Sequence, residues 1–149
     1  MGDCYWLGRG VPKDDAKTFE SYERAVKLGW AMGYMSMGYC YSFGKGVPKD
    51  CAKAFEYYER AAKLGCSTGY TEMGTCYNLG KGVPKDLAKA FEHYQHAMSL
   101  GSDRSKLYVA QCLTLGVGTN KDLFQAKKLL QELIDNDNAE AANFYARNF

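Results

Sequence analysis

The sequence lacks the features that mark several large classes of protein. No apolar stretch approaches the roughly 20 residues of a membrane-spanning helix, and the first residues have neither the basic nor the apolar segment of a secretory signal. The 19 basic and 17 acidic residues leave a formal net charge of only +2, without a basic stripe that would bind nucleic acid. We therefore expect a cytoplasmic protein with no membrane and no nucleic-acid partner, and secretion of a longer parent chain stays open.

Histidine is scarce, and the residues that carry most enzyme chemistry are not gathered in a known motif. The two histidines, His93 and His96, are three residues apart and could share a helix face, but no acidic or cysteine ligand follows one turn later. The glycines of residues 44–46 precede a proline and lack the spacing of phosphate-binding loops. We predict no catalytic residue, no cofactor and no metal site. A hydrolytic or metal-dependent activity at the two histidines is the alternative.

Cysteine is present, but not in an arrangement typical of a disulfide framework. Four of the six cysteines, Cys4, Cys40, Cys76 and Cys112, recur every 36 residues. Equivalent positions of stacked repeats lie roughly 10 Å apart, which exceeds the roughly 7 Å between Cα atoms that a disulfide tolerates. We therefore predict that these four do not pair with one another and are thiols in a helix interface. A bridge between Cys40 and Cys51 stays open.

The dominant feature of the chain is a repeat of 36 residues. The pentapeptide Gly-Val-Pro-Lys-Asp begins at Gly10, Gly46 and Gly82, and an altered fourth copy begins at Gly118. A fixed period of this length is typical of a solenoid, in which each unit covers the apolar face of its neighbour. The hydrophobic content of 46% and aromatic content of 14% can fill the core of a single array over residues 1–149. This organisation favours a binding scaffold over an enzyme.

Each repeat predicts two antiparallel helices, which we call helix A and helix B. Helix A covers about residues 31–43 and should end at Gly44, because glycine accepts the positive φ of a helix C-terminus. Pro48 cannot continue that helix, and Asp50 suits the N-cap of helix B. The predicted elements are a partial helix at 3–7, loops at 8–14, 44–50, 80–86 and 116–122, helices at about 13–28 and 51–64, and a terminal helix at 138–149.

Small residues inside helix A predict a close helix contact. Gly38 and Gly74 lie in its interior, where glycine costs roughly 0.5–1 kcal/mol relative to alanine. The fourth repeat has Ala110 at this position, which is also small. We infer that a larger side chain does not fit there.

The repeat resembles a known family. The run from Met37 to Asp50 and the residues after it are similar to the Sel1-like repeat, a relative of the tetratricopeptide repeat; the later matches are Lys53, Ala54, Tyr57, Tyr58, Ala61 and Ala62. The resemblance covers nearly the whole chain. It implies an all-α, right-handed α-solenoid of antiparallel helix pairs and a role as an adaptor in protein complexes, often in bacterial signalling or host interaction. Some members are secreted and carry two bridged cysteines per repeat, a pattern that this chain lacks.

Comparison of the repeats with one another predicts a binding surface on helix A. Four positions of helix A differ between repeats and are spaced i, i+3, i+4 and i+7, so they form one stripe along the helix. Helix A lines the concave face in tetratricopeptide-like solenoids, and methionine and aromatic residues suit protein recognition. Drift on an unselected solvent face is the alternative. The predicted partner-binding residues are Met32, Met35, Ser36, Tyr39, Thr68, Thr71, Glu72, Thr75, Arg104, Leu107, Tyr108 and Gln111.

These observations predict a non-catalytic scaffold or adaptor that binds a protein or peptide partner in the concave groove lined by the A helices. The alternative is a toxin-neutralising immunity protein, or a bacterial effector, that inhibits a target enzyme by occluding it. The sequence leaves the oligomeric state open.

Overall fold

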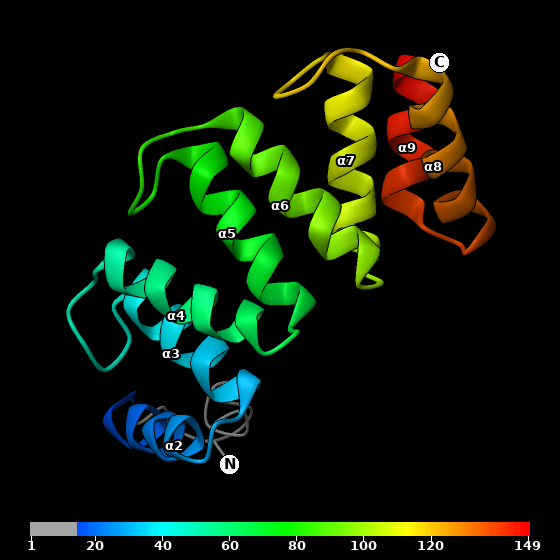
Figure 1. Cartoon of the computed structure of the whole chain (residues 1–149). Coiled ribbons are helices and arrows are strands. Elements are labelled where there is room, and N and C mark those ends of the chain that lie inside the picture. Colours follow the sequence, from blue (N-terminus) through cyan, green and yellow to red (C-terminus); the bar gives the residue numbers. More distant parts are fainter. Residues whose placement is uncertain (1–14) are drawn as a thin grey trace.

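The computed structural model describes residues 15–149, and within this range the chain consists of helices joined by short loops, with no strand (Figure 1). The helices are α2 (Asp15–Lys27), α3 (Ala31–Phe43), α4 (Cys51–Lys63), α5 (Ser67–Leu79), α6 (Leu87–Ser99), α7 (Asp103–Leu115), α8 (Leu123–Asp135) and α9 (Ala139–Asn148). The predicted bounds of helix A at 31–43 are those of α3, and α4 ends one residue before the predicted bound. The predicted partial helix at 3–7 and loop at 8–14 lie outside the described residues.

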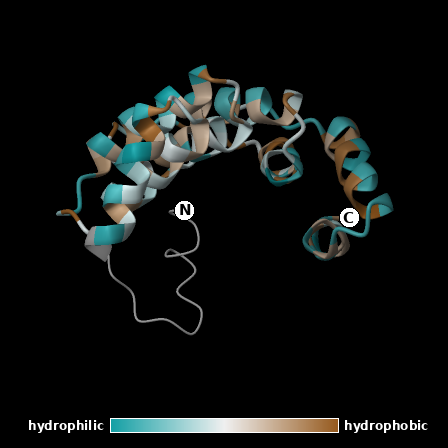
Figure 2. Cartoon of the chain, turned by 90° about the horizontal axis from the view of Figure 1, so that it is seen from below, coloured by the Kyte–Doolittle hydropathy of each residue, from teal (hydrophilic) through white to brown (hydrophobic). Residues whose placement is uncertain are grey.

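The helices pack as antiparallel pairs that stack on one another. Helices α3, α5 and α7 each pack against the helix that follows, and the contacts of α2 with α3, α4 with α5, α6 with α7 and α8 with α9 join successive repeats. Helices α3, α5, α7 and α9 are therefore A helices, and α2, α4, α6 and α8 are B helices. Figure 2 shows the helices along an arc, with α9, beside the C label, on its inner side. The predicted all-α solenoid is confirmed.

The loop between helix A and helix B is built as predicted. Gly44 ends α3 in the left-handed conformation with a φ of 68°, and the equivalent glycines end α5 and α7 in the same way. The Asp50 side chain accepts a hydrogen bond of 3.1 Å from the backbone N–H of Lys53, which confirms it as the N-cap of α4. Asp86 and Asp122 cap α6 and α8 identically. These caps satisfy helix-end donors and carbonyls that would otherwise lack partners.

The second glycine of the loops at 80–86 and 116–122 makes a contact between repeats that was not predicted from the sequence. Gly82 has a φ of 74°, and a Cβ at this position would meet the backbone carbonyl of Cys51 in the preceding helix B. A Cβ at Gly118 would likewise meet the backbone carbonyl of Leu87, in the first turn of α6. The loop of one repeat therefore rests on the first turn of the previous helix B, where only glycine leaves enough room.

The glycines inside helix A receive a tyrosine from helix B, which confirms the predicted close contact. A Cβ added at Gly74 would lie 2.7 Å from the ring of Tyr94, a buried residue of α6. In the last complete pair the glycine is replaced by Ala110 and the tyrosine by Leu130, and both are fully buried. The larger A-helix residue therefore occurs with the smaller B-helix residue, which keeps the total volume of the contact similar.

The described cysteines are all free. Cys40 and Cys76 are buried and Cys112 is half-buried, as predicted for thiols in a helix interface. The bridge that the sequence left open between Cys40 and Cys51 is not formed, and Cys4 lies outside the described residues. Burial raises the pKa of the Cys76 thiol to about 11. A thiol with this pKa is protonated at neutral pH and is a weak nucleophile.

None of the described helices has the length and apolar character needed to cross a membrane.

The paired replacement of glycine and tyrosine gives a stability prediction. Gly74→Ala should lower the free energy of unfolding by about 1–3 kcal/mol because the new methyl group meets the Tyr94 ring. Tyr94→Leu should cost less in the Gly74→Ala background than in the wild type, since the double variant reproduces the native pairing of Ala110 with Leu130. Urea unfolding of the four proteins would measure a coupling of about 1 kcal/mol. Additive effects would show that the two residues do not share one packing site.

Candidate functional site

The structure divides the predicted stripe into a buried part and an accessible part. Four of the twelve predicted residues are buried, with at most 7% of each residue exposed, so they pack between helices and do not offer a surface to a partner. The prediction that these four contact a partner is therefore corrected. They are Met35, Ser36, Thr71 and Leu107.

Packing between neighbouring A helices accounts for the variation at one of these buried positions. The Thr71 hydroxyl in α5 hydrogen-bonds the Ser105 hydroxyl in α7 at 2.7 Å, and both are buried. One repeat later the equivalent residues are Leu107 and Ala141, which belong to one apolar cluster. A hydroxyl pair in one interface thus corresponds to an apolar pair in the next. Packing across the interface therefore explains why these residues differ between repeats, and no binding partner is needed to explain the difference.

The other eight predicted residues have access to solvent and lie on α3, α5 and α7. We call these eight residues the groove set. Met32 and Arg104 are among the most exposed, with 57% of the Met32 residue and 59% of the Arg104 side chain accessible. The groove set comprises Met32, Tyr39, Thr68, Glu72, Thr75, Arg104, Tyr108 and Gln111.

Polar contacts within the groove set connect three successive A helices. Glu72 of α5 accepts a hydrogen bond from the Tyr39 hydroxyl of α3 and forms an ion pair with Arg104 of α7, with 3.5 Å between Oε1 and Nη1. Arg104 also donates from Nε to the Tyr108 hydroxyl at 3.0 Å. A guanidinium has five N–H donors in a planar fork, so the exposed Arg104 retains donors that face solvent.

Glu72 is the electrostatic centre of this network. Only 14% of its side chain is exposed, and burial raises the pKa of its carboxyl although Arg104 and the Tyr39 hydroxyl act in the opposite direction. Burial, together with the nearby Glu72 carboxylate, raises the pKa of Tyr39 to about 12. Tyr39 is therefore a neutral hydrogen-bond donor at physiological pH. Partial burial of a carboxylate costs free energy, because the charge loses contact with water. An apolar residue could fill the same space without this cost.

Tyrosines of the B helices complete the surface between the A helices. Tyr39 packs edge-on against Tyr58 with 5.7 Å between ring centroids. One repeat later Tyr94 lies 4.9 Å from the ring of Tyr108, and its hydroxyl is 3.2 Å from that of Thr75. The sequence analysis did not assign these B-helix tyrosines to the site. Their recurrence opposite the helix A glycines was the available signal.

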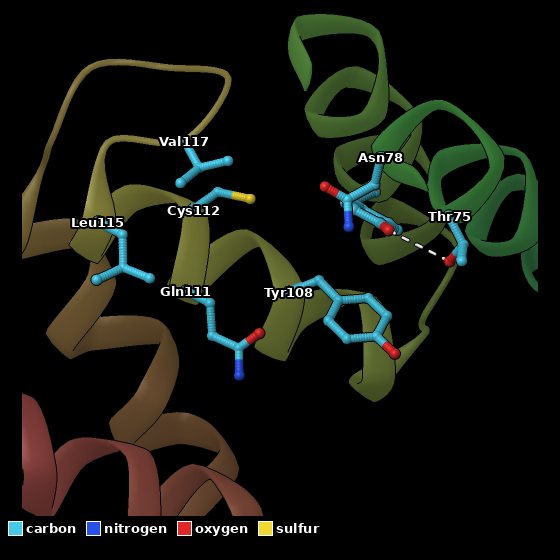
Figure 3. Close-up of a pocket in the computed structure, with 8 residues that line it drawn as sticks. Thr75, Asn78, Tyr108, Gln111, Cys112, Leu115 and Val117 are labelled. Atoms are coloured by element: carbon cyan, nitrogen blue, oxygen red, sulfur yellow. Dashed lines mark hydrogen bonds between the residues drawn. The ribbon is translucent and has the colours of Figure 1, made fainter. Parts of the chain in front are cut away.

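A cavity of about 260 Å³ lies between α5 and α7. Three members of the groove set, Thr75, Tyr108 and Gln111, contribute to its wall. Figure 3 shows Thr75 and Asn78 of α5 across the cavity from the side chains of α7. The full lining is Thr75, Asn78, Tyr94, Tyr108, Gln111, Cys112, Leu115 and Val117. This combination of aromatic and aliphatic walls with a few amide and hydroxyl groups is typical of a binding pocket.

A row of exposed apolar side chains extends the stripe to the C-terminal end of each A helix. The row consists of Phe43, Leu79 and Leu115, which are 60%, 55% and 54% exposed. Phe43 stacks near Tyr39 with 6.5 Å between ring centroids, and Leu115 lines the cavity. The row was missed because its members are all apolar and were not counted among the differing positions. Its position four residues after the last column of the stripe was the signal that could have found it.

The two histidines lie on α6, outside the groove set, and are engaged in aromatic packing. His96 stacks on Tyr70 with 4.0 Å between ring centroids, and His93 lies 5.3 Å from the ring of Tyr77. Nδ1 of His93 is 2.7 Å from the carbonyl of Lys89. Among residues 15–149, no group of three or more histidine, cysteine or acidic residues could hold a metal ion. The geometry of the described residues thus gives no support to histidine-based chemistry.

The raised pKa of Glu72 gives a prediction about the pH dependence of stability. The Glu72 carboxyl binds a proton more tightly in the folded state than in the unfolded state, so protonation of this group stabilises the folded state at low pH. That stabilisation is lost as the pH rises above the ordinary carboxyl pKa of 4.5. Glu72→Gln should therefore gain stability relative to the wild type as the pH increases from about 4 to 7. Thermal melts across this range would measure the difference. Parallel pH profiles would mean that Glu72 titrates normally.

Four consecutive segments of the chain match the Sel1 repeat family, at residues 1–30, 31–66, 67–102 and 104–138. These segments cover most of the 149 residues. Sel1 repeats are commonly protein-interaction scaffolds. No protein of curated function matches the chain.

Solved structures with the same architecture support this assignment. A Sel1 repeat protein from Oxalobacter formigenes has 32% identity and a TM-score of 0.85, over 94% of this chain and 57% of that one. The protein c5321 is a protective antigen that is present in uropathogenic Escherichia coli strains and displays an SLR fold. It has 26% identity and a TM-score of 0.88, over 97% of this chain and 31% of that one. Cysteine rich protein B of Helicobacter pylori has 28% identity and a TM-score of 0.68, over 92% of this chain and 98% of that one. The chain thus spans less than two thirds of the first two proteins. It is a member of the Sel1 repeat family.

Proposed function

We propose that this chain is a non-catalytic scaffold that binds a protein or peptide partner in the groove formed by α3, α5 and α7. The partner would contact the groove set and the exposed apolar row at the ends of these helices. No step of this function requires a cofactor or a bound metal.

The observation that carries the proposal is the contact network among residues of three different repeats. Tyr39, Glu72 and Arg104 lie in three different repeats, and the solenoid brings them, with Tyr108 on the same helix as Arg104, into one connected line. Side chains held by mutual hydrogen bonds lose less conformational freedom when a partner binds, which favours affinity. A line of contacts across three helices suits an elongated partner segment.

The composition of the groove also supports recognition of a protein. Tyrosine and arginine are enriched among the residues that contribute most to protein interfaces, and both occur here with large exposed apolar neighbours. The exposed residues Met32 and Phe43 lie on the same helix as Tyr39. Methionine side chains adapt to irregular surfaces because they are unbranched and flexible.

Capture experiments with groove variants would test this function. The wild-type chain and the triple variant Tyr39→Ala, Glu72→Ala, Tyr108→Ala would be immobilised and exposed to a lysate of the source organism. We expect a partner that is captured by the wild type and reduced at least tenfold with the variant, equivalent to about 1.4 kcal/mol. Circular dichroism would verify that the variant remains helical.

A matched variant on the B helices provides the control. Glu56, Glu92 and Phe124 are exposed, with 84% of Phe124 accessible, and their replacement by alanine removes two carboxylates and one aromatic ring from another surface. This control should capture the partner as the wild type does. Equal capture by the groove variant, or loss with the control variant alone, would contradict binding through the A helices.

A further inference from the structure

The loops after the A helices carry a row of lysines with no acidic partner. In three consecutive repeats the fourth residue of the Gly-Val-Pro-Lys-Asp loop, or of its altered copy, is an exposed lysine, and none of the three forms an ion pair with a described residue. The members of this lysine row are Lys49, Lys85 and Lys121. The aspartates that follow them are engaged as helix caps.

The lysine row lies beside the exposed apolar row. Each lysine packs on the glycine that ends helix A, since a Cβ built on Gly80 would lie 3.3 Å from Cβ of Lys85, and one built on Gly116 would lie 3.0 Å from Cγ of Lys121. Those glycines directly follow Leu79 and Leu115 of the apolar row. The end of each A helix therefore presents one large apolar side chain and one ammonium group.

The cavity between α5 and α7 opens at this same position. Leu115 and Val117 form its wall together with Tyr94 and Tyr108. Its volume of about 260 Å³ is below the roughly 300–1,000 Å³ of pockets that bind drug-sized molecules. A cavity of this size is suited to one large apolar side chain of a partner.

We infer that the groove recognises an acidic linear segment of a protein, in which one large apolar residue enters the α5–α7 cavity and flanking carboxylates pair with the lysine row. This inference rests on the function proposed above and specifies the chemistry of the partner. Neighbouring repeats are roughly 10 Å apart, and an extended chain advances roughly 3.3 Å per residue. Carboxylates about three residues apart would therefore match successive lysines.

Charge complementarity favours a carboxylate-bearing peptide over other anionic partners. The net charge of the whole chain is only +2, whereas binding of nucleic acid uses a broad basic face. The lysines alternate with large apolar side chains and adjoin a cavity, and complementary charge and apolar anchors together are characteristic of peptide recognition. Each lysine lies near the C-terminus of helix A and directly before the N-cap of helix B, so its charge acts on the dipoles of both helices. The test must therefore separate binding from stability.

Selection of random linear peptides displayed on phage against the immobilised full chain would test the inference. We expect enrichment of peptides that carry one large apolar residue with aspartate or glutamate nearby. The dissociation constant of the most enriched peptide, measured by fluorescence anisotropy, should increase about tenfold or more for Lys85→Glu with Lys121→Glu. It should also increase when sodium chloride is raised from about 0.05 to 0.5 M.

Two further variants control for charge and for folding. Lys85→Gln with Lys121→Gln removes the charge without repulsion and should weaken binding to a smaller extent. Lys27→Glu with Lys63→Glu alters exposed lysines in the last turns of B helices and should leave binding within about twofold. Thermal melts of all variants would separate loss of binding from loss of fold.

Several results would overturn the inference. Enrichment of basic or uncharged peptides, no enrichment at all, or acidic peptides whose binding survives Lys85→Glu with Lys121→Glu would each contradict it. Binding of an oligodeoxythymidine or of phosphatidylglycerol vesicles through the lysine row, without enrichment of acidic peptides, would assign the row to another partner. Enriched peptides without acidic bias that still require Tyr108 would contradict the acidic partner while leaving groove binding intact.

Discussion

A close contact between each A helix and the paired B helix determines how the solenoid packs. Glycine meets tyrosine in the α3–α4 and α5–α6 pairs, and Ala110 and Leu130 take their places in the α7–α8 pair. This contact sets the distance between the two helices, and the second loop glycine sets the distance to the next repeat by resting on the preceding helix B. Both contacts recur with the 36-residue period, so each repeat is placed on the last in a similar way. The regular stacking brings side chains from three repeats, including Tyr39, Glu72 and Arg104, into one line across the A helices.

The same close contact links the core to the candidate binding surface. Because glycine leaves space beside helix A, the rings of Tyr58 and Tyr94 reach between the A helices and contact Tyr39 and Tyr108 of the groove set. The pKa of Tyr94 is raised to about 12, mainly by burial, so the hydroxyl remains a neutral hydrogen-bonding group. Tyr58 and Tyr94 are buried in the core and also contact the groove set, so the groove set should be rigid where the core is rigid. Rigid positioning of aromatic and polar groups favours selective binding.

The sequence predicted the helices, their caps and the need for small residues because local patterns determine these features. It did not separate the buried from the accessible part of the stripe, because Thr71 and Glu72 are adjacent on one helix and only the stacking angle of the next repeat decides which is covered. Variation between repeats did not by itself identify accessible residues. Thr71 is buried and changes from repeat to repeat together with Ser105, the residue that it packs against. Tyr94 of helix B contributes to the site through its contacts with A-helix residues, and these tertiary contacts cannot be read from the spacing of residues along one helix.

Hydrogen exchange of the chain, alone and bound to its captured partner, would test whether the stacked A helices form the binding surface. We expect slower exchange on binding in segments covering α5, α7 and the loops at 80–86 and 116–122, because contact with a partner suppresses local opening there. Slower exchange confined to α4, α6 and α8, with no change in the A helices, would contradict it.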